Sequence, residues 1–472
     1  MGNSTYIDND IVTVWKDLSK ARDSENILAV LYRGDEVTLL EQKDGNSRVA
    51  LGGGREGWIR NPVRFRGTGL LELAFLDVGQ GDACLMTTPK RSRILIDGGE
   101  NKQCARYLAA KFWDETSAGR DVLLDAIVVT HGDADHFDGL SILTIDAASE
   151  TRRRKRIRIA TRRVFHNGLV KRQAAGPECE LLGPTLDLSG KMVIPVVDDP
   201  RTVRDPNGPF RRWQEALTQL ESRHPVKMEP LNASKVDAFS FLDDVQVAVL
   251  GPQGIVLPDG RTGLPMLSND GGAAPSAART INGHSVVLKV TLGNVSVLLT
   301  GDLHAQAEQD LVQLHRAGRI SLRAEVLKVP HHGSDDVSRD FISAVEPIIS
   351  VISAGDEDAR RDYLHPRANL LGLLGRTNRG AEPVIFVTNL AAFDRWAGNA
   401  FRAKKKGDSW VPDVTAGTFY ARERTAYGII HVRTDGSRLL VVRRGARQDR
   451  NEPYSYRVAG NGAISRLGID RA

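Results

Sequence analysis

The part of the chain after Leu70 alternates short apolar runs with helical stretches, and this pattern restricts the possible folds more than any other feature. The runs that we expect to form strands cover residues 71–76, 94–96, 126–129, 245–250, 286–290, 295–299, 326–329 and 348–352. Helical stretches are predicted at residues 105–113, 210–221 and 304–314. Strands with helices between them favour a layered α/β fold.

The two ends of the chain have a different pattern, so three segments are predicted. Residues 1–67 contain short β-like runs separated by turns such as Gly52-Gly53-Gly54, as expected of a small all-β barrel. Residues 68–380 hold the α/β core, within which residues 257–278 are rich in small residues and predict a loop. Residues 381–472 are again rich in predicted strands and are expected to complete the core.

The composition argues against a membrane-spanning protein and against a disulfide scaffold. The 472 residues are 41% hydrophobic and 26% charged, which is globular composition. No apolar run approaches the roughly 18 residues of a membrane span, and the first residues lack the pattern of a secretory signal. Cys84, Cys104 and Cys179 are too widely spaced for a disulfide framework. We therefore expect a cytoplasmic location.

The net charge of +5 is small, but the basic residues are clustered. Clusters of Lys and Arg lie at residues 152–163, 404–406 and 443–450. They form either solvated faces or, if they converge on one cleft, a channel for an anionic substrate. The sequence leaves both interpretations open.

The residues with the clearest chemistry lie in the segment Thr130-His131-Gly132-Asp133-Ala134-Asp135-His136, directly after a predicted strand. Its imidazoles and carboxylates are the nitrogen and oxygen ligands that Zn²⁺ or Mn²⁺ accepts. Asp302 and the pair His331-His332 follow two later predicted strands. Because strand ends can meet at one edge of a sheet, we expect these side chains to lie close together. The ordered set predicts a metal site.

These motifs resemble those of the metallo-β-lactamase superfamily, and most closely the metallo-hydrolase domain of ComEC-type competence proteins. The resemblance covers residues 70–437 and is carried by segments 75–83, 94–99, 282–288, 299–302, 328–334 and 365–366. It implies an αββα sandwich with the site at one edge, between the sheets. Residues 1–67 resemble a bacterial SH3-type domain through Gly34-Asp35-x-Val37 and Gly57-Trp58-Ile59.

The superfamily resemblance implies a site for two divalent cations, Zn²⁺ or Mn²⁺. The implied ligands are His131 and Asp133 for the first cation, Asp135, His136 and His331 for the second, and Asp302 between the two. Asp133 stands where lactamases and glyoxalases have histidine, and its oxygen favours manganese.

The remaining site residues are implied less directly. The third ligand of the first cation would fall near Thr280, a poor ligand, and His284, Asn282 and His166 are the nearby alternatives. We expect catalytic roles for Asp135, His332 and His365, and substrate binding by Ser334, Asn282, His284 and Asn167. His332 and His365 would hold or protonate the substrate, or else orient metal ligands.

Two cations of this kind activate water for attack on phosphorus or on a carbonyl carbon. The resemblance, Asp133 and the basic clusters favour a phosphodiesterase or nuclease that acts on nucleic acid or a nucleotide. The alternatives are a hydrolase of a carbon-centred substrate (a lactam, lactone or thioester) and a non-catalytic metal-containing binding protein. The SH3-like segment suggests a protein partner.

Overall fold

The computed structural model describes most of the chain. The described residues are 3–143, 156–173, 181–268, 274–355, 365–380, 382–392, 402–406, 409–413, 424–445, 451 and 453–472. Cys179 and residues 152–155 and 446–450, which belong to two of the basic clusters, lie outside them, as do the side chains of residues 404–406. No helix in the described part of the chain is long and apolar enough to cross a membrane.

The larger of two central sheets has ten strands and combines early and late parts of the chain. In spatial order they are β17 (Lys227–Pro230), β14 (Arg163–His166), β12 (Ala126–Val129), β10 (Arg93–Ile96), β9 (Cys84–Thr87), β8 (Leu71–Phe75), β30 (Ile429–Thr434), β31 (Arg438–Arg444), β32 (Pro453–Val458) and β33 (Ile464–Leu467). Strands β10, β12, β14 and β17 are parallel, and the other pairs are antiparallel. The C-terminal strands β30 to β33 therefore extend the sheet that contains β8.

The second sheet has six strands. They are, in order, β18 (Gln246–Gly251), β21 (Val287–Leu292), β22 (Val295–Leu299), β23 (Val326–Lys328), β24 (Ile349–Ile352) and β25 (Val384–Val387). Strands β22 to β25 run parallel, so their carboxyl ends lie at one edge. Each matches an apolar run, which is the pattern of strands buried on both faces.

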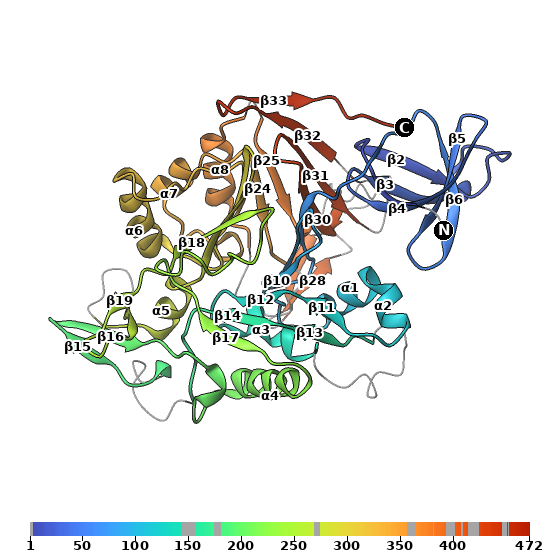
Figure 1. Cartoon of the computed structure of the whole chain (residues 1–472). Helices are drawn as coiled ribbons and strands as arrows, with labels where there is room; N and C mark the ends of the chain where they lie inside the picture. The colour runs from blue at the N-terminus through green and yellow to red at the C-terminus, as the bar shows by residue number, and fades with distance from the viewer. Residues whose placement is uncertain are drawn as a thin grey trace.

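The two sheets pack face to face, with helices on both outer faces (Figure 1). Alternation along β8 shows this directly: Leu73 and Phe75 enter the core between the sheets, whereas Ala74 faces the helical side. Helices α1 (Gln103–Lys111), α3 (Ala134–Ser141) and α4 (Gly208–Arg223) cover the ten-stranded sheet. Helices α6 (Ala305–Arg316), α7 (Arg339–Val345) and α8 (Ala368–Thr377) cover the six-stranded sheet. The protein is a mixed α/β sandwich of four layers.

Smaller elements surround these layers. They are α2 (Trp113–Ser117), α5 (Ala277–Gly283), the pairs β11 (Val122–Leu124) with β13 (Ile159–Thr161), β26 (Asn389–Ala392) with β29 (Arg424–Tyr427) and β27 (Arg402–Lys406) with β28 (Ser409–Asp413), and the sheet β15 (Leu186–Leu188), β16 (Lys191–Pro195), β20 (Thr262–Pro265) and β19 (Ile255–Val256). The predicted loop at residues 257–278 thus includes strand β20, which pairs with β16 and β19.

The N-terminal segment forms a sheet of its own rather than the predicted closed barrel. Its strands are β1 (Asn3–Ile7), β2 (Ile11–Trp15), β3 (Ile27–Tyr32), β4 (Glu36–Lys43), β5 (Asn46–Leu51), β6 (Arg55–Arg60) and β7 (Phe65–Arg66), in the order β3-β2-β6-β5-β4-β1-β7. Its end strands β3 and β7 do not pair with each other, so the sheet is a half-barrel and the SH3-like barrel is not confirmed. The likeness rested on short turn motifs, which predict hairpins but not closure.

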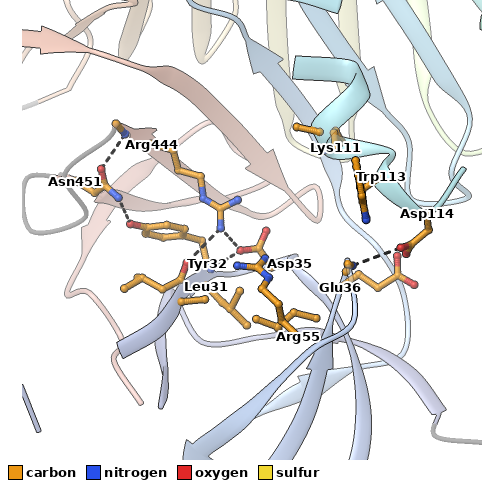
Figure 2. Close-up of a pocket in the computed structure, with 17 residues that line it drawn as sticks. Leu31, Tyr32, Asp35, Glu36, Arg55, Lys111, Trp113, Asp114, Arg444 and Asn451 are labelled. Carbon is orange, nitrogen blue, oxygen red and sulfur yellow. Dashed lines mark hydrogen bonds and ion pairs between the residues drawn. The ribbon is translucent and has the colours of Figure 1, made fainter. Parts of the chain in front are cut away.

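The N-terminal sheet is attached to the C-terminal strands by buried ion pairs. Arg433 of β30 donates to Asp35 and to Glu72, each at 2.8 Å, and to the carbonyl of Arg33. Figure 2 shows a second link, in which Arg444 pairs with Asp35 at the wall of an open cavity of about 770 Å³. Contacts with strands β30 and β31 therefore take the place of a closing strand pair.

Candidate metal centre

The predicted metal-ligating residues come from both sheets and meet at one edge. The segment 130–136 follows β12 of the ten-stranded sheet, and α3 begins within it, so Asp135 and His136 lie in the first helical turn. Asp302 follows β22 and His332 follows β23 of the six-stranded sheet. The strand ends of the two packed sheets thus bring together side chains that are far apart in the sequence.

Four of these side chains form a compact cluster. Asp135, His136, Asp302 and His332 each offer one ligand atom, and these atoms all lie within 4.8 Å of one another. Nε2 of His332 lies 3.0 Å from Oδ2 of Asp302 and 3.3 Å from Nε2 of His136. Oδ2 of Asp135 lies 3.2 Å from the same His332 nitrogen. This donor set is one that Zn²⁺ or Mn²⁺ accepts.

Hydrogen bonds orient both imidazole rings of the cluster. Nδ1 of His136 donates to Asp97 at 2.9 Å, and Nδ1 of His332 donates to the carbonyl of Ser353 at 3.0 Å. Each bond fixes the proton on Nδ1, so the Nε2 lone pair faces the cluster and is available to a cation. Asp97 also accepts hydrogen bonds from the backbone N–H and the hydroxyl of Thr130. It therefore holds the metal-ligating loop as well as the ring.

The carboxylates of the cluster favour positive charge among its four side chains. Burial disfavours the charged imidazoles, but the neighbouring carboxylates, Asp302 above all, raise the pKa values of His136 and His332 well above the usual value. Burial likewise opposes ionisation of Asp302, yet the two histidines hold the pKa of this carboxyl well below its usual value. Protons supply the charge in the absence of a cation, and cation binding would release them.

The turn after β23 decides which histidine enters the cluster. His331 and His332 have left-handed backbone angles, with φ of 47° and 52°, and Gly333 follows at 86°. Such angles are rare for residues other than glycine and are found where the surrounding structure imposes them. They turn His332 into the four-residue cluster. His331, the ligand implied by the resemblance, lies outside it, with its ring 6.1 Å from that of His332.

A buried lysine lies behind the cluster and was missed as a site residue. Nζ of Lys328 pairs with Asp82, donates to the carbonyl of Gly301 at 3.1 Å and lies 3.8 Å from Asp302. Asp82 in turn lies 3.4 Å from Nδ1 of His332. The detectable signal was a lysine inside an apolar strand of a sheet buried on both faces, where a charge needs a partner.

The predicted first cation position has fewer ligands. Nε2 of His131 is buried and has no hydrogen-bond partner, and it lies 3.9 Å from both Asp133 and Asp302. Asp133, however, forms an ion pair with Lys171. His131 and Asp133 therefore border the cluster without belonging to the group of four.

The proposed third ligands of the first position are engaged elsewhere. The Thr280 hydroxyl donates to the carbonyl of Ser276 at 2.7 Å. His284 donates from Nε2 to the carbonyl of Pro265 at 2.7 Å, and His166 bonds through both ring nitrogens to backbone groups. Burial lowers the pKa of each of these two histidines to about 4, so both are neutral near pH 7.

The remaining predicted site residues are Asn167, Asn282, Ser334 and His365, and they differ in whether other groups already engage them. Asn167 donates to the carbonyl of His284 at 3.1 Å, and this bond uses its amide in the loop structure. Oδ1 of Asn282 is buried without a hydrogen-bond partner. Ser334 accepts a hydrogen bond from the backbone of Asp336 at 3.3 Å. The His365 ring lies 6.2 Å from that of His331, so His365 is at the rim of the cluster.

The fold and the cluster define an α/β sandwich protein with a candidate metal centre where its two sheets meet. No family model matches the chain. ComE operon protein 3 of Bacillus subtilis (strain 168) is 26% identical over 320 residues, which cover 65% of this chain and 30% of that protein. Competence protein ComA of Neisseria gonorrhoeae is 39% identical over 95 residues, 20% of this chain and 13% of that protein. The similarity to competence proteins that the motifs predict is thus confirmed.

These matches cover parts of longer proteins, since the chain spans 30% of the Bacillus protein and 13% of the Neisseria protein. Among solved structures, a putative metal-dependent hydrolase from Parabacteroides distasonis aligns with a TM-score of 0.28 and 10% identity, over 68% of this chain and 93% of that one. A diphosphatase of the PhnP family aligns with a TM-score of 0.26 and 11% identity, over 60% and 85% of the two chains.

Proposed function

We propose that this protein is a divalent-metal-dependent hydrolase whose cation is bound by Asp135, His136, Asp302 and His332. The observation that carries the proposal is the convergence of their ligand atoms within 4.8 Å at the strand ends. A divalent cation at such a site supplies the Lewis acidity that activates water and polarises the bond to be cleaved. His131, Asp133 and His331 complete the ligand set that the resemblance implies and border the same cluster.

We propose a phosphodiester of nucleic acid or a nucleotide as the substrate. Cations at the rim of the cluster support this choice. Arg367, which donates its backbone N–H to Gly333 at 2.9 Å, has a buried Nε without a hydrogen-bond partner. Lys171 forms an ion pair with Asp133, which borders the cluster. Charged donors of this kind bind phosphate oxygens well, and one of the relatives is named competence protein ComA.

We propose roles in this reaction for His365, Asp135, His332, Ser334 and Asn282, whereas His284 and Asn167 are held by other hydrogen bonds. Burial and the nearby charges of His332, His331 and Arg367 lower the pKa of His365 to about 4. A neutral His365 can donate one N–H to a phosphate oxygen without competing for a cation. Asp135 and His332 face the cation directly, and Ser334 and Asn282 offer polar groups near the same loops.

The N-terminal half-barrel is proposed to bring a partner to this hydrolase. It corresponds to the first of the three segments predicted above, with residues 68–380 as the catalytic core and residues 381–472 completing it. The cavity between the half-barrel and the helices α1 and α2 supports a docking role, because Tyr32, Arg55 and Trp113 line it (Figure 2).

The test is hydrolysis by the full chain loaded with Mn²⁺ or Zn²⁺. Linear and circular DNA, RNA and cyclic dinucleotides would be offered, with the variants His136→Ala and Asp302→Ala beside the wild type. Asp138→Asn is a matched control, since Asp138 pairs with Arg212 and belongs to neither group of potential metal ligands in the described part of the chain. We expect metal-dependent cleavage that both alanine variants abolish and the control retains. Metal binding without cleavage of any phosphodiester would instead favour a carbon-centred substrate or a binding role.

A further inference from the structure

The first cation position has fewer ligands of its own than the second, and this difference bears on how many cations the protein binds. The second position has four converging ligand atoms, two of them imidazole nitrogens with a fixed tautomer. The first position has only His131 and Asp133 of its own, with nearest ligand atoms 3.9 Å apart, and it would have to share Asp302 with the second position. A divalent cation needs three or more protein ligands for stable binding in sites of this kind.

Besides the shared Asp302, the side chains predicted as a third ligand of the first position are engaged elsewhere in the described part of the chain. Thr280, His284 and His166 are engaged by backbone groups as described above. His304, which follows Asp302 closely in the sequence, donates from Nε2 to the carbonyl of Arg279 at 2.8 Å. None of these side chains belongs to a group of potential metal ligands in the described part of the chain.

A positive charge is already present at this position. Nζ of Lys171 forms an ion pair with Asp133, and both side chains are largely buried, with 29% and 24% of their surfaces exposed. The backbone at Lys171 is held from outside the site, because its carbonyl accepts from the N–H of Asn207 at 3.0 Å. Asn207 is itself the N-cap of α4 and accepts from Phe210. The packing of α4 therefore fixes the backbone from which the Lys171 side chain reaches Asp133.

We infer that the protein binds one divalent cation and that the ammonium group of Lys171 takes the place of the second. This inference rests on the proposed function. Asp133 is then a partner of Lys171 rather than a metal ligand. The Lys171 side chain is 29% exposed, and its ammonium group has further N–H donors that can bind an anionic oxygen of the substrate, as a phosphoryl oxygen would require. The substrate class implied is an ester of a negatively charged phosphoryl group.

Metal stoichiometry tests the inference independently of activity. The full chain would be dialysed to equilibrium against Mn²⁺, the bound metal measured by mass spectrometry, and the bound Mn²⁺ examined by electron paramagnetic resonance. We expect one Mn²⁺ per chain with the spectrum of an isolated ion. Two Mn²⁺ per chain with an exchange-coupled spectrum would overturn the inference while leaving the proposed function intact. No bound metal would overturn the proposed function itself.

Two variants test the role of Lys171. In Lys171→Met we expect one Mn²⁺ per chain still and a KM for the phosphodiester substrate raised about 10- to 100-fold, the value of one lost charged hydrogen bond. Lys171→Arg keeps the charge and should restore most of the affinity. An unchanged KM in Lys171→Met, with normal thermal unfolding, would refute the binding role.

Discussion

Asp97→Asn is predicted to weaken metal binding while leaving the fold intact. Asp97 accepts three hydrogen bonds, from Nδ1 of His136 at 2.9 Å and from the backbone N–H and hydroxyl of Thr130 at 2.8 and 2.7 Å. Asparagine has the same shape and tolerates the positive φ of 59° at this position. Either orientation of its amide, however, places an NH₂ group against one of these donors.

The expected loss follows from the proton on His136. If the amide NH₂ faces His136, Nδ1 must accept, the proton moves to Nε2, and the lone pair that faces the cluster is lost. Loss of one charge-assisted hydrogen bond costs about 1.5–3 kcal/mol, which is about a 10- to 100-fold increase in Kd. Substitutions of residues that orient a metal ligand have effects in the same range.

The assay is the Kd for Mn²⁺ measured by competition with a chelator at constant pH. Asp138→Asn makes the same chemical change on α3, the helix that carries His136. Asp138 pairs with the exposed Arg212 at 2.6 Å, and the substitution should alter Kd by less than about twofold. If the Asp97→Asn protein unfolds normally and its Kd stays within about threefold of wild type, the orienting role of Asp97 is refuted.

Three further predictions concern stability. Arg433→Met removes a buried guanidinium from Asp35 and Glu72, which keep Arg444 and Lys111 as partners, and should lower the free energy of unfolding in urea by about 1.5–3 kcal/mol. Arg48→Met, at an exposed pair, should cost less than about 1 kcal/mol. Equal losses would contradict this prediction. The pKa of His284 is lowered to about 4 in the folded protein, so between about pH 6.5 and 4 the unfolded chain binds a proton at this residue that the folded chain does not. The free energy of unfolding should therefore fall as the pH drops from about 6.5 to 4. His284→Gln should make this dependence on pH less steep. Removal of the metal with EDTA should lower Tm, because metal at a hundredfold excess over its Kd stabilises the folded state by about 2.7 kcal/mol. His136→Ala should abolish this shift in Tm. A shift that persists in the variant would place the metal elsewhere.

Local patterns predicted most of the elements that carry the site. The apolar runs at residues 94–96, 126–129 and 295–299 coincide with β10, β12 and β22, since continuous burial on both faces leaves a clear apolar signature. Closure of the N-terminal barrel could not be predicted in the same way. It depends on whether the end strands pair with each other, and here the C-terminal strands contact the N-terminal sheet instead.

The sequence alone determined the chemistry available to the site: which carboxylates and imidazoles follow which strands. Their order, and the similarity to competence proteins, follow from residues that are near one another in the chain. Only the tertiary structure decided which of the two adjacent histidines enters the cluster, because the left-handed turn at residues 331–333 is imposed by the packing around it. It alone also brought Lys171 to Asp133 and Lys328 to Asp82, pairs far apart in the sequence that meet because buried charges require partners.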